Sequence, residues 1–239
     1  DFMATQPNYK GALTQYMTHP EEWTYHIPEG MTTMEGALVE PAAVGMHAAV
    51  LGGAQPGKSI VILGGGTIGL MVLQACISLG ATDITVVDVI EKRLELAKKL
   101  GAARVINGKE EDTVAVLRSE EMYGDHGVDL VFEAAGAVFT AQQAVQIVSR
   151  GGKIMMVGTQ SKPVQIDFLK INREVTIQTS FRYCNNFPQT IEAISSGRFN
   201  VKDMVTNIYD YEDVQKAFEE AIDPVKKTEM VKGVIKVAE

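Results

Sequence analysis

The chain has 239 residues, of which 46% are hydrophobic and 22% are charged, and its formal net charge is -8. This size suits one large globular domain or two modest ones. The acidic balance argues against nucleic acid or an anionic membrane as the main partner, and no apolar run reaches the roughly 18 residues of a membrane span. The first residues are polar, so we expect no signal peptide.

The first 45 residues mix short polar and aromatic stretches with four prolines. Residues 25–30 predict a strand that ends in a turn. Thr32 or Thr33 is expected to cap a helix that runs to Leu38, and a second helix is expected at 41–51 with proline at its start.

From residue 59 onward, short apolar runs rich in β-branched residues alternate with helical patterns. Strands are expected at 60–63, 84–87, 104–106, 130–133, 153–157 and 175–179, and helices at 67–79, 90–100, 113–121 and 139–147. Because the strands lack polar alternation and helices separate them, they predict a parallel sheet that is covered on both faces. Six strands in this rhythm are typical of the doubly wound α/β dinucleotide-binding fold.

After Cys184 the pattern predicts another domain segment. A helix is expected at 188–195, an extended segment at 204–209, a helix at 211–221 and a final strand at 233–237. We therefore expect residues 46–184 to form a Rossmann domain that binds NAD, while residues 1–45 and 185–239 belong to a second domain.

The segment from Gly64 to Gly69 fits the phosphate-binding motif G-x-G-x-x-G. It directly follows an apolar strand and opens a helix, which is the context that the motif requires. Gly64 permits the tight turn, Gly66 lets the backbone approach a pyrophosphate, and Gly69 allows close packing of helix on strand. The helix N-terminus, with Thr67, then offers N–H groups to the phosphates. The alternative is a glycine-rich turn without a ligand.

Asp88 closes the second strand about twenty residues beyond this motif, where a carboxylate can bind the adenosine ribose hydroxyls. It would repel a 2′-phosphate, so we expect a preference for NAD over NADP. A helix N-cap is the alternative role, and the two roles are compatible. Arg93 lies one helical turn further and either covers the adenine or ribose or is a solvated helix residue.

Four segments together are similar to one family of enzymes. They are the E-G-A-x-x-E-P segment at 35–41 with Val44 to Ala48, the cofactor motif at 61–69 with Asp88, the E-x-x-G segment at 133–136, and Phe181-Arg182-Tyr183-Cys184-Asn185. The chain resembles the zinc-dependent medium-chain dehydrogenases, and within them the sorbitol (L-iditol) and xylitol dehydrogenases. The segment at 181–185 is the most specific for the polyol branch.

The resemblance implies an oxidoreductase that transfers hydride from a secondary hydroxyl of a sugar alcohol to NAD. It implies a Rossmann sheet plus the remnant of a GroES-like, mainly-β catalytic domain. Glu40 corresponds to a glutamate beside the catalytic zinc, as an indirect or alternate ligand, and Arg182 and Tyr183 to residues that contact the polyol. The remaining implied cofactor contacts are Ile68, Val157, Gly158, Thr159, Ser180, Phe181 and Arg182. Glu40 as a helix-terminus carboxylate and Arg182 as a surface or ion-pair residue are the alternatives.

The family's zinc ligands, an early Cys and a Gly-His-Glu segment, do not occur in these residues, and neither does its four-cysteine lobe. Cys76 and Cys184 form no CxxC pair, and we expect the four histidines to be structural or exposed. The segment at 2–11 resembles one found after that lobe, so we expect a truncated form that binds NAD and oxidises polyols poorly by itself. Zinc is expected for the full-length family enzyme.

Three alternatives in function remain open. The chain belongs to a polyol dehydrogenase, to a non-catalytic NAD-binding protein, or to a threonine, butanediol or galactitol dehydrogenase. The Phe181-Arg182-Tyr183 segment favours a polyol over threonine. We expect a cytoplasmic protein, because its few cysteines suit a reducing compartment, and the resemblance implies a homodimer or homotetramer that associates through the strand at 175–179.

Overall fold

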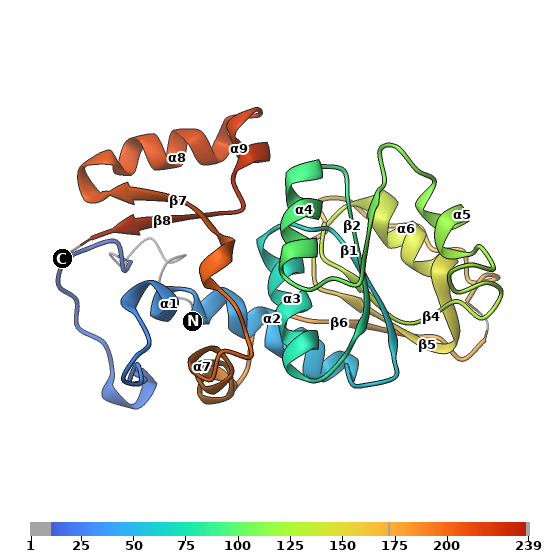
Figure 1. Ribbon diagram of the computed structural model, residues 1–239, viewed down its shortest axis with the longest axis horizontal. Coiled ribbons are helices and arrows are strands. Elements are labelled where there is room, and N and C mark those ends of the chain that lie inside the picture. Colours follow the sequence, from blue (N-terminus) through green and yellow to red (C-terminus); the bar gives the residue numbers. More distant parts are fainter. Residues whose placement is uncertain (1–10, 172, 238–239) are drawn as a thin grey trace. The chain divides into compact units, whose positions relative to one another are not determined.

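The computed structural model describes residues 11–171 and 173–237, and these divide into two compact units (Figure 1). The larger unit spans residues 27–204, and the smaller unit combines the chain up to His26 with the chain from Val205 onward. The boundaries that we expected after residues 45 and 184 both lie inside the larger unit. The assignment of 1–45, 46–184 and 185–239 to domains therefore stays a prediction.

A six-stranded parallel sheet forms the centre of the larger unit, in the order β3-β2-β1-β4-β5-β6. Its strands are β1 (Ser59–Leu63), β2 (Asp83–Asp88), β3 (Arg104–Asn107), β4 (Val128–Glu133), β5 (Val148–Met156) and β6 (Thr176–Thr179). The strand order reverses between β1 and β4, and ligands of such sheets bind outside the carboxyl ends of the strands at this point. The doubly wound Rossmann sheet expected from the sequence is confirmed.

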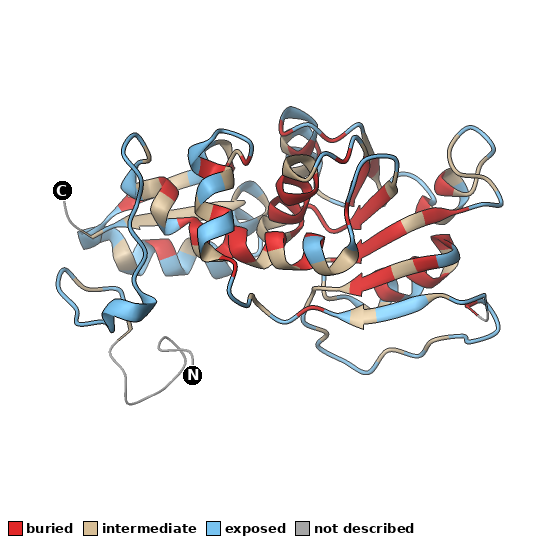
Figure 2. Cartoon of the chain, turned by 90° about the horizontal axis from the view of Figure 1, so that it is seen from below, coloured by how far each residue is buried: buried red, intermediate tan, exposed pale blue. Residues whose placement is uncertain are grey.

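Helices cover both faces of the sheet, with α3 and α4 on one side and α5 and α6 on the other (Figure 1). The helices are α2 (Val39–Gly52), α3 (Thr67–Ser78), α4 (Glu91–Lys99), α5 (Thr113–Leu117) and α6 (Val138–Ile147). Val61 and Leu63 of β1 belong to the apolar cluster beneath α5 and α6, whereas Ile62 lies against Gly69 of α3. Because successive strand residues face opposite sides, β1 is buried on both. Figure 2 shows most strands of the larger sheet as buried.

Side-chain caps set the start of two helices. The Thr32 hydroxyl accepts a hydrogen bond from the Glu35 N–H, and the Glu35 carboxylate accepts one from the Thr32 N–H at 2.8 Å, so α1 (Thr33–Ala37) begins with a capping box. Asp112 caps α5. That helix ends at Leu117, earlier than predicted, because the chain then turns back and its carbonyls accept hydrogen bonds from Arg118.

The strand predicted at residues 25–30 is wrong, because this segment joins neither sheet. Its turn is present: the Met31 N–H donates to the Pro28 carbonyl at 3.1 Å, and Gly30 has a φ of 87°. Pro28 has no N–H to donate to a neighbouring strand, so the aromatic and β-branched residues before it are extended without forming a ladder.

The larger unit also contains α7 (Phe187–Ser195), and the smaller unit is a two-stranded parallel sheet with two helices. Its elements are β7 (Val205–Asp210), α8 (Val214–Ile222), α9 (Lys226–Glu229) and β8 (Lys232–Lys236). The Tyr209 hydroxyl of β7 donates to the Glu220 carboxylate of α8 at 2.7 Å. Whether this unit belongs to a GroES-like domain stays a prediction. None of the helices in the described part of the chain is long and apolar enough to cross a bilayer.

Gly45 offers a test of how closely α2 and α3 pack. A Cβ at Gly45 would overlap the main chain of Met71, whereas one at Gly52 of the same helix would meet side chains of Phe132 and Leu130 at 3.0–3.2 Å. Overpacking typically costs about 1–3 kcal/mol, and side chains yield more easily than main chain. We expect Gly45→Ala to lower the free energy of unfolding by about this amount and Gly52→Ala by clearly less, in urea titrations. Equal stabilities would contradict the packing.

Candidate functional site

The carboxyl ends of five strands bring most of the predicted cofactor residues to one edge of the sheet. Leu63 at the end of β1 pairs with Val87 and Glu133, and Met156 pairs with Glu133 and Thr179. The segments that follow these strands therefore begin at the same level. They carry the glycine motif, Asp88, residues 157–159 and residues 180–182.

The glycine motif forms a tight turn between β1 and α3. Gly64 has a φ of 109°, and a Cβ there would lie 2.8 Å from the Ala135 nitrogen. A Cβ on Gly69 would overlap the Gly64 carbonyl oxygen. Gly66 is the N-cap of α3, has no capping side chain, and has no atom closer than 3.9 Å to an added Cβ, at Arg93. The motif thus leaves space and helix N–H groups for a phosphate.

Asp88 is buried at the end of β2 and faces this turn. One carboxylate oxygen accepts the Gly65 N–H at 2.7 Å, and the other accepts the N–H groups of Val89 and Ile90 at 2.8 and 2.9 Å. Ile90, not Asp88, is the N-cap of α4. The capping alternative is therefore not the geometry found, and the carboxylate is aimed at the phosphate loop instead.

Arg93 of α4 lies beside Asp88 and the glycine turn. Its Nη1 is 3.6 Å from the Asp88 carboxylate, and its guanidinium is the group nearest to the open side of Gly66. Only 24% of its side chain is exposed, which is low for a solvated helix arginine. The pair of Asp88 and Arg93 forms the wall of the turn on the β2 side.

A second carboxylate, Glu133 at the end of β4, is fully buried. Its Oε1 accepts the N–H groups of Ala135 and Gly136 at 3.0 and 2.9 Å and lies 2.7 Å from the Thr140 hydroxyl. Its Oε2 accepts the side-chain amide of Gln160 at 2.7 Å. The sequence placed Glu133 in the E-x-x-G segment but assigned it no role. A single carboxylate at the end of an apolar strand is the sequence feature that could have indicated its importance.

The segments after β5 and β6 contact the same centre. The N–H groups of Val157 and Gly158 both donate to the Glu133 carbonyl at 2.8 Å, and a Cβ on Gly158 would lie 2.8 Å from the Glu133 carboxylate. Ser180 is buried, and its N–H donates to the Met156 carbonyl at 2.9 Å. Thr159 and Phe181 are exposed. These positions suit a ligand that lies across the edge.

The structure joins Glu40 of α2 to Tyr183, which are far apart in the chain. Burial, the Glu40 charge and a hydrogen bond to Glu40 raise the pKa of the Tyr183 hydroxyl, and Arg182 acts in the opposite direction. The Arg182 guanidinium lies 5.3 Å from the ring centre of Phe181. The residues that the resemblance assigns to substrate thus converge on one place.

The loop that carries Arg182 and Tyr183 has an unusual backbone. Arg182 and Asn185 have φ values of 52° and 51°, in the left-handed region that residues other than glycine rarely adopt. Asn186 anchors the loop, since its buried side-chain amide donates to the Ala43 carbonyl of α2 at 2.8 Å. The Tyr183 ring packs edge-on against Phe187 at 4.9 Å. Sequence reasoning did not identify Asn186.

The described residues, 11–171 and 173–237, contain no group of three or more His, Cys, Asp or Glu side chains that could hold a metal ion. The His126 Nε2 lies 3.8 Å from the Asp129 carboxylate. Cys76 is buried, and burial raises the pKa of its thiol. Cys184 is exposed. Among the described residues, Glu40 has no further ligands beside it and does not fit a zinc ion.

Comparison with known proteins identifies relatives along the whole chain. An uncharacterized zinc-type alcohol dehydrogenase-like protein of Escherichia coli is 64% identical over all 239 residues, which correspond to 68% of its length. A sorbitol dehydrogenase of Bacillus subtilis is 39% identical over 92% of this chain and 62% of its own length. The chain thus spans about two thirds of the length of the curated relatives that it matches.

Solved structures agree with the fold. A crystal structure of an Escherichia coli oxidoreductase/dehydrogenase of unknown specificity, described as involved in membrane biogenesis, is 63% identical with a TM-score of 0.96, over 100% of this chain and 68% of that one. A putative zinc-binding dehydrogenase of Sinorhizobium meliloti bound to NADP is 24% identical with a TM-score of 0.88. The match covers 95% of this chain and 67% of that one, and it supports the fold alone. Residues 67–196, more than half of the chain, match the zinc-binding dehydrogenase family. The chain belongs to the zinc-binding dehydrogenases.

Proposed function

We propose that this chain is the cofactor-binding part of an NAD-dependent polyol dehydrogenase. The observation that carries the proposal is that the glycine turn, Asp88 and the segments after β4, β5 and β6 meet at the carboxyl ends of the strands. An extended dinucleotide fits this arrangement, with its pyrophosphate at the N-terminus of α3. NAD is favoured because a 2′-phosphate would lie beside the buried carboxylate of Asp88.

A sugar alcohol is the proposed substrate class. Glu40 of α2 and Tyr183 are in contact, and Arg182 directly precedes Tyr183 on its loop with several donors on its guanidinium. A carboxylate, a phenol and a guanidinium together can pair with several adjacent hydroxyls. The sorbitol dehydrogenase among the relatives supports the same class. The Phe181-Arg182-Tyr183 segment again favours a polyol over threonine.

The steps proposed for this chain are binding and orientation. A bound nicotinamide would supply the redox chemistry by accepting the hydride of the substrate carbon, while the proton of the hydroxyl would be released to solvent. The segments at 157–159 and 180–182 would hold the nicotinamide half, while Glu40 and Tyr183 orient the hydroxyl. Holding the two reacting carbons at a short distance is the contribution that such positioning makes to the rate.

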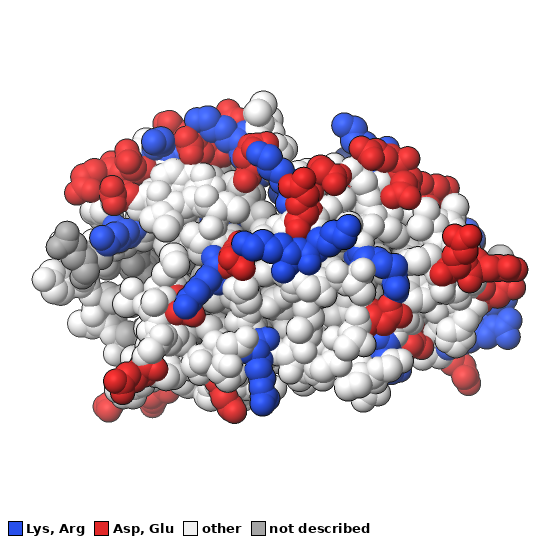
Figure 3. Space-filling view, in the orientation of Figure 1, with Lys and Arg blue, Asp and Glu red and all other residues white. Residues whose placement is uncertain are grey.

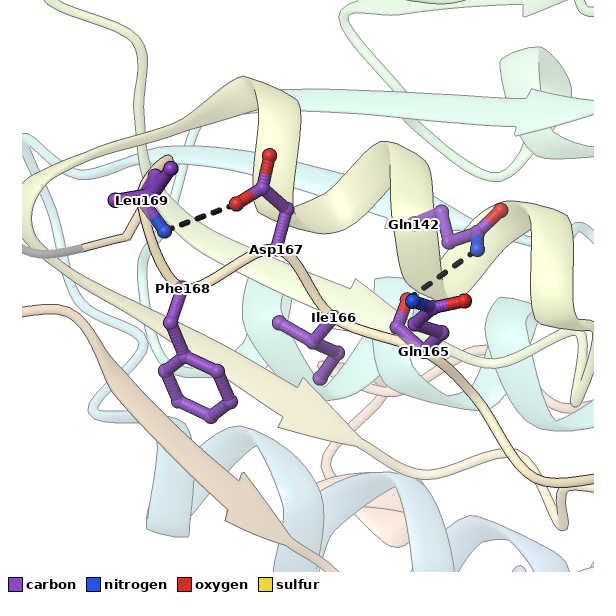
Figure 4. Close-up of a pocket in the computed structure, with 6 residues that line it drawn as sticks. All are labelled: Gln142, Gln165, Ile166, Asp167, Phe168 and Leu169. Carbon is purple, nitrogen blue, oxygen red and sulfur yellow. Dashed lines mark hydrogen bonds between the residues drawn. The ribbon is translucent and has the colours of Figure 1, made fainter.

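A homodimer or homotetramer formed through the edge of the sheet is also proposed. β6 pairs with β5 on one side, and its other side is the edge of the sheet. Three of its four residues are exposed, and it is drawn largely in pale blue in Figure 2. The loop at 165–169, which precedes β6 in the chain, forms an open pocket with Gln142 of α6 (Figure 4). Phe168 and Leu169 of this loop are exposed. An unpaired strand edge beside exposed apolar side chains favours association.

Small molecules, not nucleic acid or membrane, are the proposed partners apart from a second copy of the chain. The net charge is -8, and on the face drawn in Figure 3 Lys and Arg side chains lie beside Asp and Glu side chains. A surface of mixed sign with an acidic balance offers little to a polyanion.

Cofactor preference tests the proposal at Asp88. We expect calorimetry to show that NADH binds at least about tenfold more tightly than NADPH, because the 2′-phosphate carries more than one negative charge. Asp88→Ala should remove this preference and release Arg93, which lies 3.6 Å away, to pair with the 2′-phosphate. Adding Arg93→Met should abolish that gain in NADPH affinity. Glu91→Gln is the control, since it removes an exposed carboxylate from the same helix. Equal affinities in the unmodified chain would contradict the proposal.

Titration of Tyr183 tests the contact with Glu40. Burial, the Glu40 charge and the Glu40 hydrogen bond raise its pKa, so Glu40→Gln should lower that pKa while burial still keeps it above the ordinary tyrosine value. NMR of ring-labelled tyrosine would follow the titration, with Tyr183→Phe to assign the signal. Tyr16→Phe serves as a control at an exposed position. A Tyr183 pKa unchanged by Glu40→Gln would show that the two side chains are apart in solution.

Light scattering tests the proposed interface. The unmodified protein should have at least twice the chain mass of 26.0 kDa, and Ile177→Lys in β6 should shift it toward a monomer. A charge on an edge strand opposes pairing between strand edges. Ile208→Lys, on β7 of the smaller unit, is the matched control and should leave the mass unchanged. A monomeric unmodified protein would count against this interface.

A further inference from the structure

The side-chain amide of Gln160 has a hydrogen-bond partner for its nitrogen but none for its oxygen. It follows β5 directly after the segment at 157–159. Its Nε2 donates to Glu133 Oε2 at 2.7 Å. Its Oε1 is buried and has no hydrogen-bond partner among the described residues. A buried acceptor without a donor is rare in folded proteins, and a bound ligand is one explanation for it.

Glu133 determines which way the Gln160 amide points. The Glu133 carboxylate accepts the hydrogen bond in this pair, so the N–H₂ group of the amide faces it. Its other oxygen already faces the N–H groups of Ala135 and Gly136 and the hydroxyl of Thr140. The Gln160 oxygen is therefore directed away from Glu133, whose carboxylate is fully buried.

The position of this oxygen in the fold indicates what could bind it. Doubly wound sheets bind a dinucleotide as two mononucleotide halves, and β4, β5 and β6 belong to the half opposite Asp88. The Glu133 main chain also accepts the N–H groups of Val157 and Gly158, so the same residue sets the path of the loop that carries Gln160. The nicotinamide riboside half of NAD has two kinds of donor, the carboxamide N–H₂ and the ribose hydroxyls.

We propose that Gln160 Oε1 accepts a hydrogen bond from the nicotinamide riboside half of the cofactor, and that Glu133 is the positioning residue that directs it. The proposal rests on the proposed NAD function and adds to it. Glu133 does not touch the cofactor in this arrangement. It acts through Gln160, because without Glu133 the amide could rotate and exchange the positions of its nitrogen and oxygen.

The test compares NADH with ADP, which lacks the whole nicotinamide riboside, by calorimetry on the full chain. Gln160→Met keeps the length of the side chain and removes the acceptor, and it should weaken NADH binding about five- to tenfold while ADP affinity stays unchanged. Glu133→Gln should cause the same selective loss, because an amide there can face the Gln160 oxygen. Gln215→Met, an exposed glutamine on α8, is the control and should change neither affinity.

A reduced 3-acetylpyridine analogue of NADH, which has no carboxamide N–H₂, separates the two donors. If the carboxamide is the donor, Gln160→Met will not weaken the analogue further; if a ribose hydroxyl is, it will weaken both dinucleotides equally. Both results support the proposal and identify the donor. Thermal unfolding checks that each variant is folded, and Gln160→Met decides the matter alone if Glu133→Gln does not fold.

Two results would overturn the proposal while leaving the proposed function standing. One is a Gln160→Met variant that binds NADH as the unmodified chain does, and the other is an equal loss for NADH and ADP. An unmodified chain that binds neither compound would refute the NAD function itself, and this inference with it.

Discussion

The burial of the Glu133 carboxylate is the constraint on which the middle of the binding edge depends. A buried charge is costly unless donors surround it, and Glu133 has main-chain donors from the segment after β4 and a side-chain donor from the segment after β5. Those two segments cannot move apart without leaving the charge unpaired. Gly158 packs against the same carboxylate where any side chain would intrude. Charge and glycine together thus define the distance between two loops.

The other half of the edge uses a similar principle with a different partner. Asp88 accepts the Gly65 N–H of the glycine turn and pairs with Arg93, so a carboxylate again ties a turn to a neighbouring strand. A carboxylate offers about four lone pairs, and ribose hydroxyls can therefore join these bonds without displacing them. These bonds within the chain fix the geometry of the turn, which reduces the ordering cost of binding.

Much of the fold was predictable because its strands are buried on both faces. The run Ile60–Leu63 could be neither a surface helix nor a half-exposed strand, and the strand found differs from it by one residue. The strand predicted at residues 25–30 failed because local composition does not reveal whether a neighbouring strand exists. The early end of α5 at Leu117 likewise accompanies hydrogen bonds from Arg118 to carbonyls distant in the chain, of Gln146 in α6 and Val148 at the start of β5.

The site residues likewise divide into those that a local motif predicts and those that depend on contacts between distant segments. Gly64, Gly69 and Asp88 follow from a local motif and its spacing. The roles of Glu40 and Tyr183 at the substrate were expected from resemblance alone, and their contact was not predicted, because no local pattern joins residues so far apart. Gln160 and Asn186 were missed, since their roles depend on which strand ends and helices meet across the sheet.

The two cysteines give this protein a convenient experimental property. The chain has Cys76 and Cys184, and burial raises the pKa of the first while the second is exposed. Because thiolates are the reactive form, alkylating reagents should modify Cys184 first. That thiol is next to Tyr183, in the loop with left-handed residues on either side. A fluorophore attached there would report on occupancy of the Glu40 and Tyr183 region without any engineered label.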